Sequence, residues 1–275
     1  MKRRSFRREV NPSSLQFLLD ETLLLRSRAT RDARRRFLAE GVRVANLALE
    51  SDALETLFFL PTPGNDGLRF LVRDARAHGV RCVPLDAAQF GALALGDDPQ
   101  GAVSVARMQT RPLSEAFADE GVWLALERVR NDGNLGSMLR TGEASGARGV
   151  VACGPDVDFW SPGAVRASMG ALFCQSLVRA SWRELLAFKT GRGVRWIGAA
   201  LEGAQAMGRV AFGADFWLWM GEERQGLSPR VLSACDERAC IPMRGRMDSL
   251  NVAVAAGVLL FAARRETIPV HHAAP

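Results

Sequence analysis

"CIPMRGRMDSLNVAVAAGVLLFAARR" spans residues 240–265, near the end of the chain. It begins as a short apolar run closed by Pro242, passes through a loop containing Gly245, and becomes a long apolar helix pattern. Ser249 is a candidate N-cap, which places Asn251 in the first helical turn, where backbone N–H groups are free. An amide at the start of a core helix needs a hydrogen-bond partner or a function, which other segments of the chain must supply.

The second half of the chain alternates strand-length apolar runs with longer segments, as a parallel α/β sheet does. Its apolar runs are separated by helix-length segments, and near-continuous apolar strands indicate burial on both faces. The runs are VWLALE (122–127), GVVAC (149–153), VRWIGAA (194–200), FWLWMG (216–221) and ACIPM (239–243). The pattern predicts an α/β domain in which helices cover both faces of a parallel sheet.

The first half predicts a smaller α/β unit over roughly residues 31–108. Helices are expected over residues 14–28 and 30–40, the second packing through Phe37 and Leu38. TLFFLP and VRCVPL read as strands around the helix DGLRFLVRDARAHG, while GVRVANLALES fits strand or helix. A linker is expected near residues 110–120, around Pro112.

The charge distribution points to a polyanionic partner. The chain has a formal net charge of +6 and a pI near 9.7, which favours nucleic acid. The arginine excess, with only two lysines and no tyrosine, also fits a nucleotide bias of the genome, so the position of the charge is more informative than its sum. The first 36 residues hold eleven Lys or Arg against four acids, and Arg34, Arg35 and Arg36 are candidate RNA contacts. The alternative is a solvated arginine-rich surface.

Cysteine, histidine and hydropathy patterns argue against other classes of protein. Five cysteines without a C-x-x-C pair indicate reduced, mostly buried thiols, and the three histidines form no ligand cluster with them, so no metal is expected. The N-terminus lacks the apolar core of a signal peptide, and the longest apolar stretch, residues 252–263, is too short to span a bilayer. We therefore expect a cytoplasmic protein without membrane contact, and a transit segment in residues 1–13 stays open.

Three loops follow predicted strands, and ligands of open α/β sheets bind at the carboxyl ends of strands. In ERVRNDGNLGSMLRTGEASGARG, Gly136 is expected in the strand-to-helix turn beside Asn134, with Arg140 one turn into the helix. In WMGEERQGLSPR, Gly221 and Gly226 would allow close backbone approach to a ligand. G-x-G-x-x-G cannot be fitted to these loops, which excludes a nucleotide-cofactor oxidoreductase.

The three loops together resemble a known family. NLGSMLRT, GEERQGLS and IPMRGRMDSLNVAVAAG closely resemble the three motifs of the SpoU/TrmH family, the RNA 2′-O-ribose methyltransferases of the SPOUT superfamily. VRASMGALF (165–173) is similar to a further family stretch, and the resemblance covers residues 122–265. More weakly, RDARRRFLAEGVRVANLALES resembles the ribosomal-protein-like substrate-binding domain of many members.

The resemblance implies an α/β architecture with a C-terminal trefoil-knotted, parallel-sheet (SPOUT) domain after a small α/β substrate-binding domain. The implied organisation is a basic arm and helix (1–30), an RNA substrate-binding domain (31–110), a methyltransferase domain (118–266) and a flexible tail (267–275). The implied methyl donor is S-adenosylmethionine, the substrate is RNA, and the protein is a homodimer formed through the knotted domain. The two-domain layout favours large-subunit ribosomal RNA over transfer RNA.

The resemblance also assigns residues. The catalytic set comprises Asn134, Arg140, Glu223, Ser249 and Asn251. The donor site is implied for the backbone of Gly221, Ile241 and Leu250, with Met220 and Met243 as walls. The RNA-facing side is implied for Arg166 and Ser168. Because a guanidinium keeps its proton, we expect Arg140 to stabilise a developing 2′-oxyanion, while phosphate, Glu223 or water takes the proton.

The chain departs from the family pattern at several positions, of which the second loop matters most. Glu222 stands where Asn is common and Arg224 where Gly is common, so the donor pocket is expected to differ in detail from the family pattern. The other departures are Asp132 for Pro, Gly142 for Ala and Ala253 for Ser. Two alternatives stay open: a transfer RNA ribose methyltransferase, and an inactive knotted RNA-binding protein in ribosome assembly.

Overall fold

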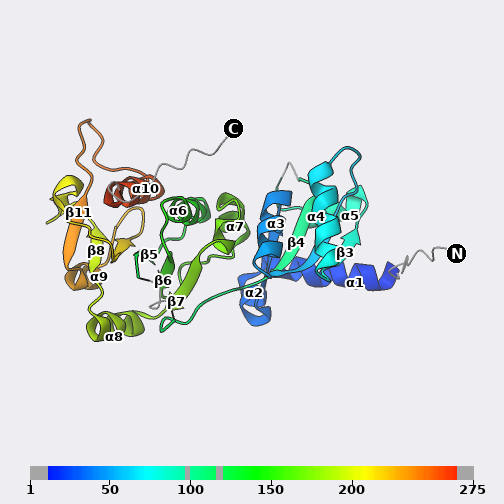
Figure 1. Ribbon diagram of the computed structural model, residues 1–275, viewed down its shortest axis with the longest axis horizontal. Helices are drawn as coiled ribbons and strands as arrows, with labels where there is room; N and C mark the ends of the chain where they lie inside the picture. The colour runs from blue at the N-terminus through cyan, green and yellow to red at the C-terminus, as the bar shows by residue number, and fades with distance from the viewer. Residues whose placement is uncertain (1–11, 97–99, 116–119, 265–275) are drawn as a thin grey trace. The chain divides into compact units, whose positions relative to one another are not determined.

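The computed structural model describes residues 12–96, 100–115 and 120–264, and the chain forms two compact units, Met1–Met108 and Gln109–Pro275 (Figure 1). The basic residues at positions 2–8 and the tail from residue 267 lie outside the described residues. Each unit is built around its own sheet.

The first unit is a four-stranded mixed sheet in the order β1-β4-β2-β3. Strand β4 runs antiparallel to β1 and β2, and β3 is parallel to β2. Its strands are β1 (Arg36–Glu40), β2 (Leu54–Phe59), β3 (Arg81–Pro84) and β4 (Ala102–Arg107). Its helices are α1 (Pro12–Leu23), the 3₁₀ turn η1 (Leu24–Arg26), α2 (Arg28–Arg34), α3 (Val42–Glu50), α4 (Asp66–Ala77) and α5 (Ala87–Leu93).

Helices cover both faces of this sheet. Leu38, Phe58 and Val103 point to the face where Leu19 of α1 and Phe90 of α5 complete a core. Helices α3 and α4 pack on the opposite face (Figure 1). Successive side chains of a strand alternate between faces, so each strand contributes to both layers.

The predicted helix over residues 30–40 is confirmed for residues 30–34 and wrong for residues 36–40. Helix α2 ends at Arg34, Arg35 adopts a left-handed φ of 55°, and the chain then enters β1. Phe37 and Leu38 are buried in that strand because β1 pairs with β4, whose pattern AVSVAR the sequence analysis missed. Tertiary pairing outweighs helix propensity here. The ambiguous segment after Gly41 is helix α3.

The second unit is a seven-stranded parallel sheet in the order β7-β6-β5-β10-β8-β11-β9, which confirms the predicted α/β fold with a parallel sheet. Its strands are β5 (Val122–Glu127), β6 (Gly149–Cys153), β7 (Ser176–Ala180), β8 (Trp196–Ala199), β9 (Gln205–Ala206), β10 (Phe216–Met220) and β11 (Glu237–Cys240). Its helical elements are α6 (Asp132–Ala144), α7 (Pro162–Ala167), η2 (Ala171–Phe173), α8 (Trp182–Arg192), η3 (Met207–Arg209), α9 (Pro229–Ala234) and α10 (Val252–Ala263). The prediction omitted β7 and β9 and extended β11 to residue 243.

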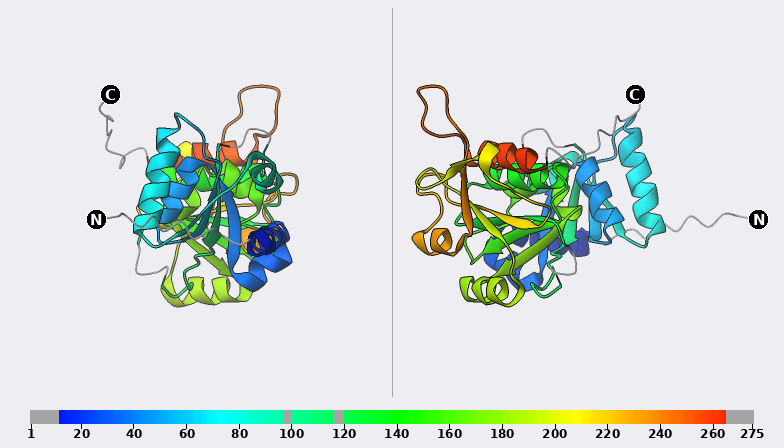
Figure 2. Two further views of the ribbon diagram at one scale, coloured as in Figure 1. Left: turned by 90° about the vertical axis from the view of Figure 1, so that its right-hand side faces the viewer. Right: turned by 60° about the vertical axis from the view of Figure 1, so that its left-hand side comes forward.

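Two helical layers enclose this sheet. Helices α6, α7 and α10 lie along one face, and α8 and α9 lie along the other (Figures 1 and 2). The layer beneath α8 and α9 is a tryptophan-rich core in which Trp123, Trp196, Trp217 and Trp219 are buried in contact. Helix α10 crosses α6, and a Cβ on Gly257 would lie 3.2 Å from Cγ2 of Thr141. The chain between β11 and α10 extends away from the sheet as a long loop (Figure 1).

Candidate active site

Asn134 joins the three loops that the sequence singled out. Its Nδ2 atom donates to Oε1 of Glu223 at 2.9 Å, and its Oδ1 atom accepts from Nδ2 of Asn251 at 2.9 Å. Strands β5 and β10 pair in parallel, so the loops that follow them leave the same edge of the sheet and can meet. The polar residues of three separate segments therefore form one hydrogen-bonded row.

Asn251 is the N-cap of α10, and this corrects the assignment of Ser249. The Oδ1 atom of Asn251 accepts from the N–H groups of Ala253 at 2.9 Å and Val254 at 3.3 Å. This leaves its Nδ2 atom free to donate to Asn134. Ser249 is exposed and donates to Asp248 at 2.9 Å. One amide side chain thus caps a core helix and fixes the first loop.

The glycines of the motifs serve packing between parts of the protein. Gly136 lies inside α6, not in the preceding turn, and a Cβ there would lie 2.4 Å from Cβ of Ala167 and 2.5 Å from O of Ala164. Helix α6 therefore packs directly against α7. A Cβ on Gly221 would lie 2.2 Å from the carbonyl carbon of Gly226, so its close approach is to the protein's own backbone, not to a ligand as expected.

Two residues at the end of β5 hold the second loop in place, and sequence reasoning missed both. Glu127 is fully buried and accepts from N of Ser228 at 2.8 Å, from Oγ of Ser228 at 2.7 Å and from Arg230 at 3.2 Å. Arg128 has a left-handed φ of 59° and donates to O of Gly226 at 3.2 Å. A carboxylate ending the apolar run VWLALE was the available signal, because a buried charge needs partners.

Arg140 lies in the third turn of α6, two turns beyond Asn134. Its side chain is exposed and has no hydrogen bond or ion pair with any described residue. A guanidinium stays protonated and offers five N–H donors. Arg140 is therefore available to a substrate phosphate or oxyanion.

The two predicted RNA contacts of the α7 segment, Arg166 and Ser168, differ in exposure. Arg166 is exposed at the end of α7 and lacks a partner within the described residues. Ser168 is fully buried, donates to O of Val165 at 2.7 Å and accepts from N of Gly170 at 3.2 Å. Its hydroxyl is used inside the turn, which contradicts a role as an RNA contact.

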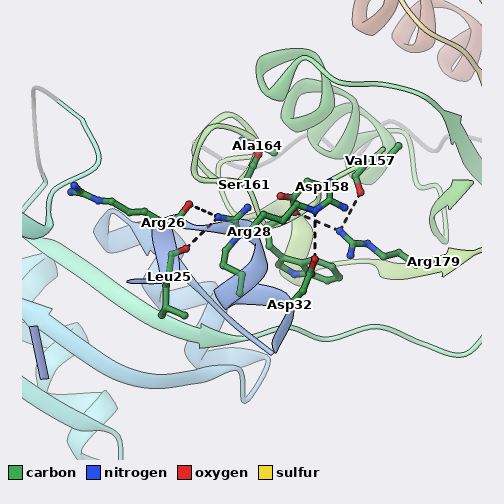
Figure 3. Close-up of polar contacts among 11 residues, drawn as sticks. Leu25, Arg26, Arg28, Asp32, Val157, Asp158, Ser161, Ala164 and Arg179 are labelled. Atoms are coloured by element: carbon green, nitrogen blue, oxygen red, sulfur yellow. Dashed lines mark hydrogen bonds and ion pairs between the residues drawn. The ribbon is translucent and has the colours of Figure 1, made fainter. Parts of the chain in front are cut away.

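The loop that leads into α7 is fixed from β7. Arg179 donates to O of Val157 at 3.1 Å and lies 3.5 Å from Oδ1 of Asp158 (Figure 3). Its guanidinium also covers the ring of Trp160 at 4.5 Å. Ser161 then caps α7 by accepting from N of Ala164 at 3.2 Å (Figure 3). The start of α7, and with it the position of Arg166, is set by these contacts.

The residues predicted to bind the methyl donor fall into a buried group and a more exposed group. Met220 and Gly221 are buried at the end of β10, whereas Ile241 is half-buried and Met243 and Leu250 are exposed. Within the described residues, no backbone N–H or C=O group of residues 242–250 has a hydrogen-bond partner. Unpaired backbone groups beside uncovered apolar side chains fit a ligand with polar edges and an apolar ring, and S-adenosylmethionine has both.

The predicted basic patch in the first unit is partly neutralised. Arg34 forms an ion pair with Glu21 at 2.7 Å and donates to its carbonyl, and Arg36 pairs with Glu55. The hydrogen bond to Glu55 raises the pKa of Arg36 despite partial burial. Arg35 is exposed. Residues 34–36 are therefore not the free cationic cluster that the sequence indicated.

Comparisons with known proteins identify the family of this chain. The model of the SpoU rRNA methylase family matches residues 121–261. The 23S rRNA (guanosine-2′-O-)-methyltransferase RlmB of Ralstonia nicotianae is 31% identical over 228 residues, 81% of this chain and 92% of the relative. The 23S rRNA (uridine(2479)-2′-O)-methyltransferase of Streptomyces viridochromogenes is 32% identical over 258 residues, 89% and 88% of the two chains.

The similarity to a solved rRNA methyltransferase structure extends over both units of the chain. The rRNA methyltransferase of Sinorhizobium meliloti, crystallised with bound AdoMet, superposes with a TM-score of 0.83 at 29% identity, covering 92% of this chain and 95% of the other. The chain belongs to the SpoU rRNA methylase family.

Within the described ranges, no helix has both the length and the apolar character needed to cross a bilayer. The same ranges contain no cluster of three or more His, Cys, Asp or Glu side chains placed to hold a metal ion.

Proposed function

We propose that this protein transfers a methyl group from S-adenosylmethionine to a ribose 2′-hydroxyl of large-subunit ribosomal RNA. The observation that carries the proposal is the row Glu223–Asn134–Asn251, which brings three motif loops together at the carboxyl edge of a parallel sheet. Relatives of the chain act on guanosine and on uridine positions of 23S rRNA, so the nucleobase is not inferred from them.

The donor site is inferred at the loop between β11 and α10. Bound S-adenosylmethionine supplies a sulfonium methyl group that is already activated for transfer. Residues 242–250 offer backbone donors and acceptors for its polar groups, and Met243 and Leu250 offer apolar surface. Gly221 and Met220 support the floor of this site, since both are buried at the end of β10.

Arg140 and the polar row then act on the RNA. Arg140 binds the phosphate next to the target ribose and stabilises the negative charge that develops on the 2′-oxygen. Asn134 orients the carboxylate of Glu223, and Asn251 holds Asn134. Alignment of the 2′-oxygen with the methyl carbon supplies much of the rate enhancement, because the transfer is bimolecular.

Glu223→Gln distinguishes the proton acceptors. The amide oxygen of glutamine still accepts from Asn134, so donor affinity should stay within about 3-fold of the parent while the basic group is lost. A fall in kcat of more than about 10-fold identifies Glu223 as the acceptor. A kcat near that of the parent assigns the proton to phosphate or water.

The experiment that tests the proposed function uses the full chain with tritiated S-adenosylmethionine and total RNA from cells lacking the gene. We expect label in one 2′-O-methylated nucleotide of the large-subunit rRNA. Label in transfer RNA would support the alternative substrate. Donor binding or transfer that is absent with every RNA would favour an inactive RNA-binding protein.

We also infer a trefoil knot and a homodimer for the second unit. The strand order places β11 beyond β8, and the chain then returns to pack α10 on α6, which fits threading through the loop after β10. Helix α10 is apolar on all sides, and Val254 and Phe261 are about half exposed in the single chain. A second copy would bury this stripe. Sedimentation of the parent and of Val254→Asp tests the dimer.

The first unit is proposed to hold the RNA substrate, and residues 1–30 to extend that contact. The first eleven residues lie outside the described part, so the contribution of the arm rests on its charge alone. Phosphate contacts of this kind give salt-dependent affinity and little sequence choice.

A further inference from the structure

A groove on the first unit lies outside the machinery of methyl transfer. It has a volume of about 930 Å³ and runs between the loop after β2 and one side of α4. Pro61 and Pro63 form part of the loop wall. Asn65 ends that loop and caps α4 by accepting from N of Leu68 at 3.0 Å. The groove therefore lies between a loop containing two prolines and a helix with a side-chain N-cap.

Three arginines line the helical wall. Arg69, Arg73 and Arg76 follow one another at intervals of four and three residues, so they form a row about 10 Å long on one side of α4. Asp66 is the one carboxylate of the lining and pairs with Arg69 at 3.0 Å. Both side chains of that pair are more than 60% exposed, so the pair is weak and Arg69 stays accessible to another anion.

The other two arginines differ in their partners. Arg73 pairs with Asp74, which lies outside the groove lining, and Arg76 has no carboxylate partner among the described residues. The lining therefore carries more positive than negative charge. A row of guanidinium groups along a helix is suited to follow a phosphate backbone.

An exposed aromatic ring stands beside this row. Phe70 is 48% exposed, and the guanidinium groups of Arg73 and Arg69 lie 5.1 Å and 5.7 Å from its ring centroid. Single exposed apolar side chains are common, but this ring, which adjoins the groove without being part of its lining, lies near two arginines that do line it. Rings with neighbouring arginines provide stacking surfaces for nucleic acid bases.

We propose that unpaired nucleotides of the RNA substrate bind along this groove and over the adjoining ring of Phe70. Arg69, Arg73 and Arg76 of the groove lining would contact phosphates, and Phe70, which lies beside the lining, would stack on a base. The proposal rests on the proposed function, since it assigns an RNA contact in the first unit. Unpaired nucleotides are specified because a duplex hides the faces of its bases from a single ring.

Binding of a fluorescein-labelled uridine oligonucleotide of roughly 12 nucleotides to the full chain, followed by anisotropy over a range of KCl concentrations, tests the proposal. Phe70→Leu keeps an apolar side chain and removes the ring. We expect it to weaken binding at least about 5-fold, while an RNA duplex of equal length binds the parent more weakly and does not respond to the change.

The arginines are tested by the salt dependence. Arg69→Gln combined with Arg73→Gln should lower the slope of log K against log salt by about 1.4, since each phosphate contact to a single strand contributes about 0.7. Arg183→Gln is the matched control, because Arg183 is an exposed arginine on α8 of the second unit. The slope of log K against log salt should fall less in Arg183→Gln than in the double variant.

Donor binding by calorimetry separates this proposal from the proposed function. Phe70→Leu and the double arginine variant should bind S-adenosylmethionine like the parent and unfold at the same temperature. If Phe70→Leu and the double arginine variant bind the oligonucleotide like Arg183→Gln, the groove proposal is wrong whether or not the protein methylates RNA. Absence of oligonucleotide binding by the parent would also overturn it and would point to a protein partner.

Discussion

The Nδ2 atom of Asn134 donates to Oε1 of Glu223 at 2.9 Å, although 89 positions separate the two residues in the chain. The donor lies in the first turn of α6, and the acceptor lies in the loop after β10. The adjacent parallel strands β5 and β10 bring these segments to one edge of the sheet. The contact fixes the geometry on which the proposed chemistry depends.

Asn134→Asp keeps the shape of the side chain but should replace the hydrogen bond to Glu223 with repulsion between two carboxylates. Two carboxylates would face each other, and kcat/KM should fall about 10-fold or more at neutral pH. Because a close carboxyl pair retains one proton, the ratio of variant to parent activity should rise as pH is lowered. Methyl transfer measured from about pH 5.5 to pH 8 checks this.

Asn46→Asp is the matched control for that substitution. Asn46 lies on α3 of the first unit, whereas the three loops belong to the second unit. Its change adds the same charge and should leave the pH dependence of transfer unaltered. An equal fall in kcat/KM in the two variants would show that net charge, and not the contact with Glu223, accounts for the loss.

Arg140→Lys should retain the positive charge but lose the bidentate fork. We expect kcat to fall more than about 10-fold, equivalent to about 1.4 kcal/mol of transition-state stabilisation. The side chain is exposed and unbonded to other described residues, so the unfolding temperature should not change. Near-full turnover with unchanged RNA affinity would exclude bidentate positioning by Arg140.

Gly136→Ala should destabilise the second unit. The added Cβ meets Cβ of Ala167 at 2.4 Å and O of Ala164 at 2.5 Å, so α6 and α7 must separate. Overpacking of this kind costs about 1–3 kcal/mol, measurable by urea unfolding. Gly191→Ala on α8 is the control, because its Cβ meets no atom within 4 Å and helix propensity favours alanine by about 0.5–1 kcal/mol. Equal stability of the two variants would contradict close α6–α7 packing.

Thiol reactivity should follow burial. Burial raises the pKa of Cys153 to about 11 and that of Cys235 to about 12, and nearby acids add to both shifts. At pH 8 these thiols hold little thiolate, which is the reactive form. Cys174 is exposed, so iodoacetamide should label it first. Peptide mass spectrometry over time checks the order, and early labelling of Cys235 would mean that β8 and α9 open readily.

Much of the second unit could be predicted from its sequence. The apolar runs of β5, β6, β8 and β10 show burial on both faces, and the glycine- and Asn-containing loops between strand and helix point to the sheet edge. These are local signals, because a doubly buried strand needs an apolar residue at nearly every position. The resemblance of three loops to one family's motifs then predicted the chemistry and singled out Asn134, Glu223 and Asn251, which the structure joins by hydrogen bonds.

The tertiary structure decided which role each residue has. Phe37 and Leu38 lie in a strand because β4 pairs with β1, and Ser168 is internal because its hydroxyl closes a turn. The roles of Glu127 and Arg128 depend on the loop after β10, because their hydrogen-bond partners Ser228 and Gly226 lie there. Composition and periodicity determine which segments are buried, whereas the partners of a polar group depend on segments far away in the chain. Asn251 capping α10 while holding Asn134 is such a case.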